Sequence, residues 1–163
     1  MSGSSQNSTA FPGFSKAAAI IHQVLGSHFE VNPEEAIRRD DSNHIHWNIY
    51  GERGTSLLIA LHISDGQLYF VFDYILAKVE TGQPNFLYEW LLSQNPQYRH
   101  LASLGLREIE GQQHVVYSSW AKVEDLTESG FKNLLLKMSD MSEQILDQLY
   151  AQFGIEPFLK GKV

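Results

Sequence analysis

The stretch His44–Ile75 decides the fold; it reads HIHWNIYGERGTSLLIALHISDGQLYFVFDYI. Hydrophobic residues occupy every second position in its first part, which is typical of a half-buried β-strand. Two further apolar runs follow, rich in branched and aromatic residues, and turns that contain glycine separate the three segments. The stretch therefore predicts a three-stranded antiparallel meander.

The second turn of this meander determines how its second and third strands pair. Asp65-Gly66 suits a two-residue type I′ hairpin loop, which places Ile63 opposite Leu68. The first turn needs an odd number of loop residues if the first strand is to share the same apolar face, because a one-residue slip inverts a strand. We predict a three-residue loop, Glu52-Arg53-Gly54, with Gly54 in the left-handed conformation as a bulge. The face toward the helices then carries Ile45, Trp47, Ile49, Leu57, Ile59, Leu61, Ile63, Leu68, Phe70 and Phe72.

Helical spacing of apolar residues marks three other segments. Ser15–Phe29 repeats them at i, i+3, i+4 and i+7, and Ser15 is the expected N-cap. A middle helix is expected from Asn85 to about Gln94, ended by Asn95-Pro96, because the residue before a proline avoids the helical conformation. A long helix follows a cap at Asp125 or Thr127 and stops at Gly154. Its apolar stripe comprises Phe131, Leu134, Leu135, Met138, Met141, Ile145, Leu149 and Phe153.

Two more strands are expected between the middle and last helices, at Ser103–Ile109 and His114–Val123, with a turn at Gly111-Gln112. The predicted class is α+β with the order α-βββ-α-ββ-α, a five-stranded antiparallel sheet packed with helices. We expect one domain over residues 13–154, a disordered tail over 1–12 and a C-terminal tail over 155–163.

This element order resembles the type III secretion chaperone-like fold. Within that fold, the chain resembles the YbjN-type family of bacterial sensory transduction regulators. The resemblance rests on the strand block His44–Ile75, on the helix Asn85-Phe86-Leu87-Tyr88-Glu89-Trp90-Leu91-Leu92, and on Val123-Glu124-Asp125-Leu126-Thr127 before the last helix. It implies a protein-binding fold that dimerises through its middle helix, and it brings no active-site residues with it.

Composition and motifs exclude several classes of function. The 163 residues include 12 Lys+Arg against 19 Asp+Glu, and this net charge of -7 opposes a groove for nucleic-acid phosphates. The absence of cysteine excludes disulfides, thiolate metal sites and cysteine nucleophiles. No phosphate loop, dinucleotide fingerprint or nucleophile elbow occurs, and the apolar runs are too short to span a bilayer. We therefore expect a cytoplasmic, non-enzymatic protein without catalytic, cofactor-binding or metal-binding residues, nucleic-acid partners or membrane association.

Three histidines form the alternative candidate site. His44 and His46 share the face of the first strand that points away from the core, and the predicted register places His62 opposite His44 on that face. Three neutral imidazoles could bind zinc or copper. A ligand site also needs supporting second-shell groups, which the sequence does not identify, and a half-exposed sheet face accommodates histidine equally well. A metal-binding or small-molecule sensor that uses this face is the alternative function.

The middle helix carries more apolar surface than one packing face needs. Only Glu89 interrupts the apolar residues between Phe86 and Leu92. A helix that is apolar all round must be buried all round, so its second side is expected to meet either another chain or neighbouring segments of this one. We predict a homodimer, or an unidentified protein partner, and a chaperone-like or regulatory adaptor function. The predicted partner-binding residues are Phe86, Tyr88, Trp90 and Leu91.

Overall fold

The computed structural model describes residues 12–39, 45–51, 53–80, 85–98 and 102–156. Most of both predicted tails, residues 1–11 and 157–163, lies outside the described residues. The elements in chain order are α1 (Phe14–His28), α2 (Pro33–Ala36), β1 (Ile37–Arg39), β2 (Ile45–Tyr50), β3 (Ser56–Ser64), β4 (Gln67–Val79), α3 (Asn85–Tyr98), β5 (Ser103–Ile109), β6 (Gln112–Lys122), the short 3₁₀ helix η2 (Val123–Asp125) and α4 (Glu128–Phe153).

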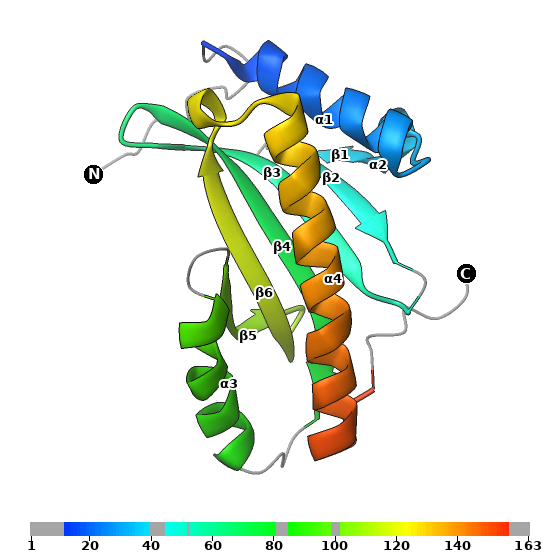
Figure 1. Ribbon diagram of the computed structural model, residues 1–163, viewed down its shortest axis with the longest axis vertical. Helices are drawn as coiled ribbons and strands as arrows, with labels where there is room; N and C mark the ends of the chain where they lie inside the picture. Colours follow the sequence, from blue (N-terminus) through cyan, green and yellow to red (C-terminus); the bar gives the residue numbers. More distant parts are fainter. Residues whose placement is uncertain (1–11, 40–44, 52, 81–84, 99–101, 157–163) are drawn as a thin grey trace.

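The strands form one antiparallel sheet in the order β1-β2-β3-β4-β6-β5. Helix α4 runs along this sheet, α1 crosses at one end of the molecule, and α3 lies beside β5 and β6 (Figure 1). The α+β class is confirmed, but the sheet has six strands where five were predicted. The additional strand, β1, is too short to show an alternating pattern, and its pairing with β2, which sets Ile37 opposite Trp47, gives it strand conformation.

The register of the meander is confirmed. Asp65 and Gly66 have φ angles of 49° and 70°, as a type I′ turn requires, and Ile63 pairs with Leu68. In the first turn, the Gly51 amide donates a hydrogen bond to the Thr55 carbonyl at 2.8 Å. This bond closes a three-residue loop, of which Glu52 lies outside the described residues.

The core lies between the predicted apolar face of the sheet and the helices α1 and α4. Of the ten side chains assigned to this face, Ile49 and Ile63 are half-buried and the other eight are buried. The Phe131 ring of α4 contacts the rings of Phe70 and Phe72 on β4, with centroids 4.9 Å and 5.4 Å apart. Offset and edge-on packing of this kind favours aromatic pairs beyond the area they bury.

The ends of the last helix agree with its predicted caps. Thr127 is the N-cap of α4, and its hydroxyl accepts a hydrogen bond from the Gly130 amide at 3.1 Å. Gly154 ends the helix with a φ of 64°, a left-handed conformation that glycine adopts without steric cost. Ile155, the first residue of the predicted tail, is buried against the core.

Three predicted boundaries were wrong. Helix α1 begins at Phe14 after an N-cap at Gly13, so Ser15 lies inside its first turn. The β5–β6 turn is Glu110-Gly111, one residue earlier than predicted, because both residues have positive φ angles and Ile109 pairs with Gln112. Helix α3 continues past Asn95-Pro96 to Tyr98, for a reason given with the site below.

None of the described helices combines the length and the apolar character needed to cross a bilayer.

Candidate protein-binding surface

One side of α3 packs against the protein's own core. Leu87 and Leu91, one turn apart, retain 0% and 3% of their surface, and the helix lies against β5, where Leu104 is also buried. Leu91, which the sequence predicted to bind a partner, therefore packs in the protein's own core in this structure.

A second side of α3 faces the end of α4. The Phe86 ring stacks on the Phe153 ring with centroids 5.3 Å apart, and Trp90 meets Phe153 edge-on at 5.5 Å. Trp90 is half-buried by this contact, whereas Phe86 remains 54% exposed. Trp90 thus contributes both to the fold and to the edge of the exposed surface.

The third side of α3 is open. Tyr88 is 40% exposed and Leu92, one turn later, is 71% exposed. The Tyr88 hydroxyl lies 3.5 Å from the side-chain oxygen of Gln113 on β6, at the outer limit of a hydrogen bond. We call the exposed side chains of Phe86, Tyr88 and Leu92 the α3 surface.

Leu92 was not among the predicted partner-binding residues, although the sequence carries a signal for it. Tyr88 and Leu92 are spaced at i, i+4, as are Leu87 and Leu91, so each pair shares one side of the helix. The sequence does not show how the helix is rotated about its axis, and this rotation decides which of the two pairs is buried.

Helix α3 is held in this rotation by Asn95. Its side-chain nitrogen donates to the Leu104 carbonyl at 2.9 Å, and its side-chain oxygen accepts from the Leu104 amide at 2.7 Å. These two bonds satisfy the outward-facing amide and carbonyl of Leu104 on β5, the edge strand. They also keep Asn95 in helical conformation before Pro96, which is why the predicted helix end was wrong. In the last turn a proline removes only one helical hydrogen bond.

The predicted histidine group is tested only in part, because His44 lies outside the described residues. On β2, His46 stands opposite Ala60 of β3, and His62 of β3 stands opposite Tyr69 of β4. The His62 ring packs edge-on against the exposed Trp120, with centroids 5.5 Å apart. Within the part of the chain that the structure describes, no three potential metal ligands converge.

A buried carboxylate on the outer face of the sheet is fully partnered. Asp73 on β4 accepts hydrogen bonds from the guanidinium of Arg107 on β5 and, at 2.6 Å, from the hydroxyl of Ser118 on β6. Buried charges that are paired and hydrogen-bonded in this way commonly hold a structure together. Asp73 therefore joins three strands, and we assign it no chemical role.

No protein-family model and no curated protein matches the chain. A chain in the crystal structure of the ExsC–ExsE complex matches it in three dimensions, with a TM-score of 0.62 and 14% sequence identity. The match covers 85% of this chain and 94% of that one. Identity this low shows the fold alone, and this likeness supports the chaperone-like fold that the element order predicts.

Proposed function

We propose that the protein is a non-enzymatic protein-binding module, a chaperone-like or regulatory adaptor, that associates through the α3 surface. One observation carries this proposal: Phe86, Tyr88 and Leu92 expose 54%, 40% and 71% of their surface on two successive turns of one helix. Tyr88 and Leu92 lie on the open side of α3, and Phe86 lies on the side toward α4. Large exposed apolar side chains mark interaction sites, and aromatic residues dominate the binding energy of protein interfaces.

Two further points support a role in binding proteins. The similar structure is that of the ExsC–ExsE complex, an assembly of two proteins. The chain also lacks the sequence motifs of phosphate transfer and of serine hydrolysis, and it has no cysteine. Membership of the YbjN-type family, which rests on the resemblance of element order, belongs to this proposal. So does a cytoplasmic location, which rests on apolar runs too short to span a bilayer.

The proposed assembly is a homodimer with α3 at its centre. A two-fold axis beside α3 would bring the same surface of two copies together, the commonest closed arrangement of identical chains. Helix α3 lies at the periphery of the fold (Figure 1), so a second copy can approach it. A stable interface of this kind typically buries about 800 Å² on each partner. The α3 surface would supply its apolar centre.

The test is a set of three aspartate variants. We expect wild-type protein to be dimeric by light scattering, and Tyr88→Asp and Leu92→Asp to be monomeric, because each places a charge in the apolar centre of the interface. Leu136→Asp is the matched control, since Leu136 is an exposed leucine on α4 outside the α3 surface. All three variants should keep the wild-type far-ultraviolet circular dichroism spectrum.

Two outcomes would contradict parts of the proposal. If Tyr88→Asp and Leu92→Asp dimerise as tightly as Leu136→Asp, the α3 surface is the wrong interface. If the wild type is monomeric at tens of micromolar, self-association is wrong and the surface must serve a different protein. That partner should then bind the Leu136→Asp variant and fail to bind Leu92→Asp.

A further inference from the structure

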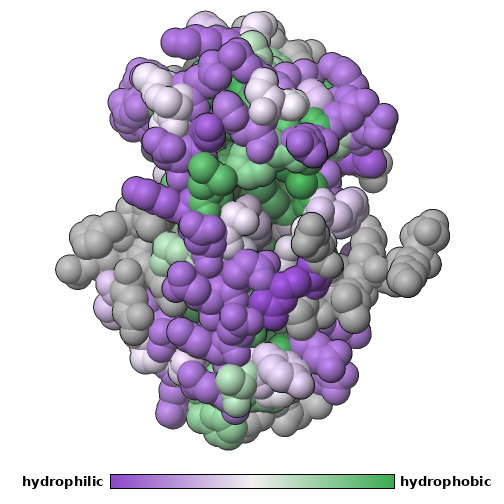
Figure 2. Space-filling model, turned by 45° about the vertical axis from the view of Figure 1, so that its right-hand side comes forward, coloured by the Kyte–Doolittle hydropathy of each residue, from purple (hydrophilic) through white to green (hydrophobic). Residues whose placement is uncertain are grey.

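A pocket of about 520 Å³ lies away from the α3 surface, between the end of α1, the β2–β3 hairpin and the middle of α4. Its volume falls within the range of about 300–1,000 Å³ that is common for small-molecule sites. Hydrophobic side chains gather in a hollow in the upper half of the molecule as seen in Figure 2, with hydrophilic side chains around it.

The walls of the pocket are largely apolar. Leu25 of α1, Leu57 of β3 and Leu135 of α4 are buried and form its inner part. Phe29, Val31 and Ile49 are half-buried and also line it. Three separate elements thus present aliphatic and aromatic surface to one space, which suits the apolar body of a ligand.

The polar groups inside the pocket are neutral. Ser142 is buried and its hydroxyl donates to the Ser139 carbonyl at 2.7 Å. Burial, with smaller contributions from the negative charges of Asp140 and Glu143, raises the pKa of Tyr74 to about 12. The Tyr74 hydroxyl therefore keeps its proton at neutral pH.

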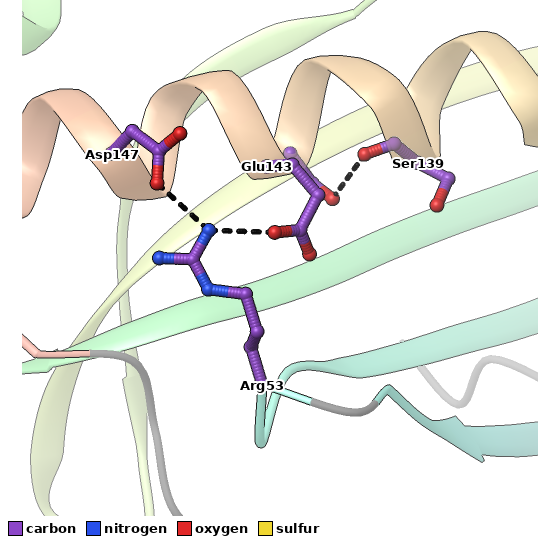
Figure 3. A network of polar contacts seen from close by, with 5 residues as sticks. Arg53, Ser139, Glu143 and Asp147 are labelled. Atoms are coloured by element: carbon purple, nitrogen blue, oxygen red, sulfur yellow. Dashed lines mark hydrogen bonds and ion pairs between the residues drawn. The ribbon is translucent and has the colours of Figure 1, made fainter.

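Two charged residues line the pocket, Arg53 and Glu143, and Asp147 lies beside them on α4, outside the lining. Arg53 reaches from the hairpin to α4, where its guanidinium donates to Glu143 at 2.6 Å and to Asp147 at 2.8 Å (Figure 3). The hydrogen bond to Glu143, then that to Asp147, raises the pKa of Arg53, which stays charged. One cation thus faces two carboxylates. The local balance disfavours an anionic group and suits a cationic one.

We propose that this pocket binds a small molecule with an apolar body and a positively charged head group. The body would lie on Leu25, Leu57 and Leu135, and the head would lie at the opening beside Glu143, which shares the cation Arg53 with the neighbouring Asp147. Arg53 is a positioning residue, because its two ion pairs hold the hairpin against α4 and so define one wall of the pocket. This site does not depend on the proposed role of α3.

The test uses three probes that share one chain and differ in the head group: octylammonium, octanol and octanoate, each below its micelle-forming concentration at neutral pH. Binding is followed by calorimetry and by methyl NMR shifts of Val31, Ile49 and Leu57. We expect octylammonium to bind tightest and octanoate weakest, with about a two- to fivefold change in affinity per step, the range of a solvent-exposed ion pair.

Variants that fill or neutralise the pocket locate the site. Ser139→Phe and Val31→Trp fill the pocket from two different walls. Each should weaken the binding of octylammonium about tenfold or more, because the ligand then loses apolar contact area inside the pocket. Ser27→Phe, on the exposed side of α1, is the control for the added ring. The double variant Glu143→Gln with Asp147→Asn should remove the preference for the ammonium group, and Asp125→Asn, exposed on η2, should not.

Three results would overturn the proposal. Octanoate could bind as tightly as octylammonium, which would show that the pocket does not prefer a positively charged head group. Octylammonium could bind both filling variants as tightly as Ser27→Phe, which would place it elsewhere on the protein. Finally, titration with any of the probes could leave the methyl shifts of the pocket residues unchanged, which would mean that the pocket takes no such ligand.

Discussion

Helices α3 and α4 lie on the same sheet but differ in how their apolar side chains are buried. The buried residues of α4 form one stripe, from Phe131 through Met138 to Leu149, and α4 has a side-chain N-cap and a glycine C-cap. Helix α3 buries Leu87 and Leu91 on one side and leaves Phe86, Tyr88 and Leu92 exposed on others. Most apolar residues of α4 lie in its buried stripe, with Leu136 and Tyr150 exposed outside it, whereas the shorter α3 exposes three large apolar side chains. The proposal that α3 binds another protein rests on this exposed apolar surface.

The largest expected effect concerns the stripe of α4. Phe131→Ala should lower the free energy of unfolding by about 3–5 kcal/mol, because it leaves a cavity beside Phe70 and Phe72. Leu136→Ala, at an exposed position of the same helix, should stay within about 0.5 kcal/mol. Chemical denaturation measures both. Equal effects would mean that α4 does not present a single buried stripe.

Two leucines of α3 sharpen the comparison within one helix. Leu87→Ala should cost about 2–5 kcal/mol, since Leu87 is fully buried, and Leu92→Ala about 0.5 kcal/mol or less in the monomer. In a dimer, Leu92→Ala should also reduce the dependence of the melting temperature on protein concentration, because association stabilises the folded chain. A Leu92→Ala variant as unstable as Leu87→Ala at high dilution would show that α3 is rotated differently.

The pH dependence of stability tests whether Tyr74 is buried beneath α4. Burial raises its pKa from 10.0 to about 12 in the folded protein. The Tyr74 hydroxyl therefore loses its proton more readily in the unfolded chain than in the folded protein. Above about pH 10 this difference favours unfolding, so the free energy of unfolding falls as the pH rises from 10 through 12. Wild-type protein should lose about 2–3 kcal/mol more stability than Tyr74→Phe over this interval, since one pKa unit corresponds to about 1.4 kcal/mol. Parallel stability curves for the two proteins would show that Tyr74 is not buried beneath α4.

The smallest effect concerns the polar side of α4. Arg53→Gln should lower the free energy of unfolding by about 1 kcal/mol or less, because its ion pairs with Glu143 and Asp147 are partly exposed. The difference from wild type should shrink at high ionic strength, where salt screens the pairs. Denaturation at low and high salt provides the measurement. A loss as large as that of Phe131→Ala would mean that Arg53 is a principal support of the fold.

Much of the fold could be predicted from local patterns. The strand register followed from the Asp65-Gly66 turn and from alternation, because both act between residues that are close in the chain. The stripe of α4 followed from helical periodicity. The candidate surface was predicted in part: Phe86 and Tyr88 are exposed as expected, but Leu91 is buried and Leu92 is exposed in its place.

The chain's own sequence thus determined which segments become strands and helices, how the central strands pair, and that α3 carries surplus apolar surface. Tertiary structure alone decided the rotation of α3, which depends on the bonds between Asn95 and Leu104. It also decided the strand conformation of β1 and the pocket, whose opening joins Arg53 to Glu143 across 90 residues of chain. Periodicity and turn chemistry are properties of neighbouring residues, whereas these contacts exist only once distant segments have packed together.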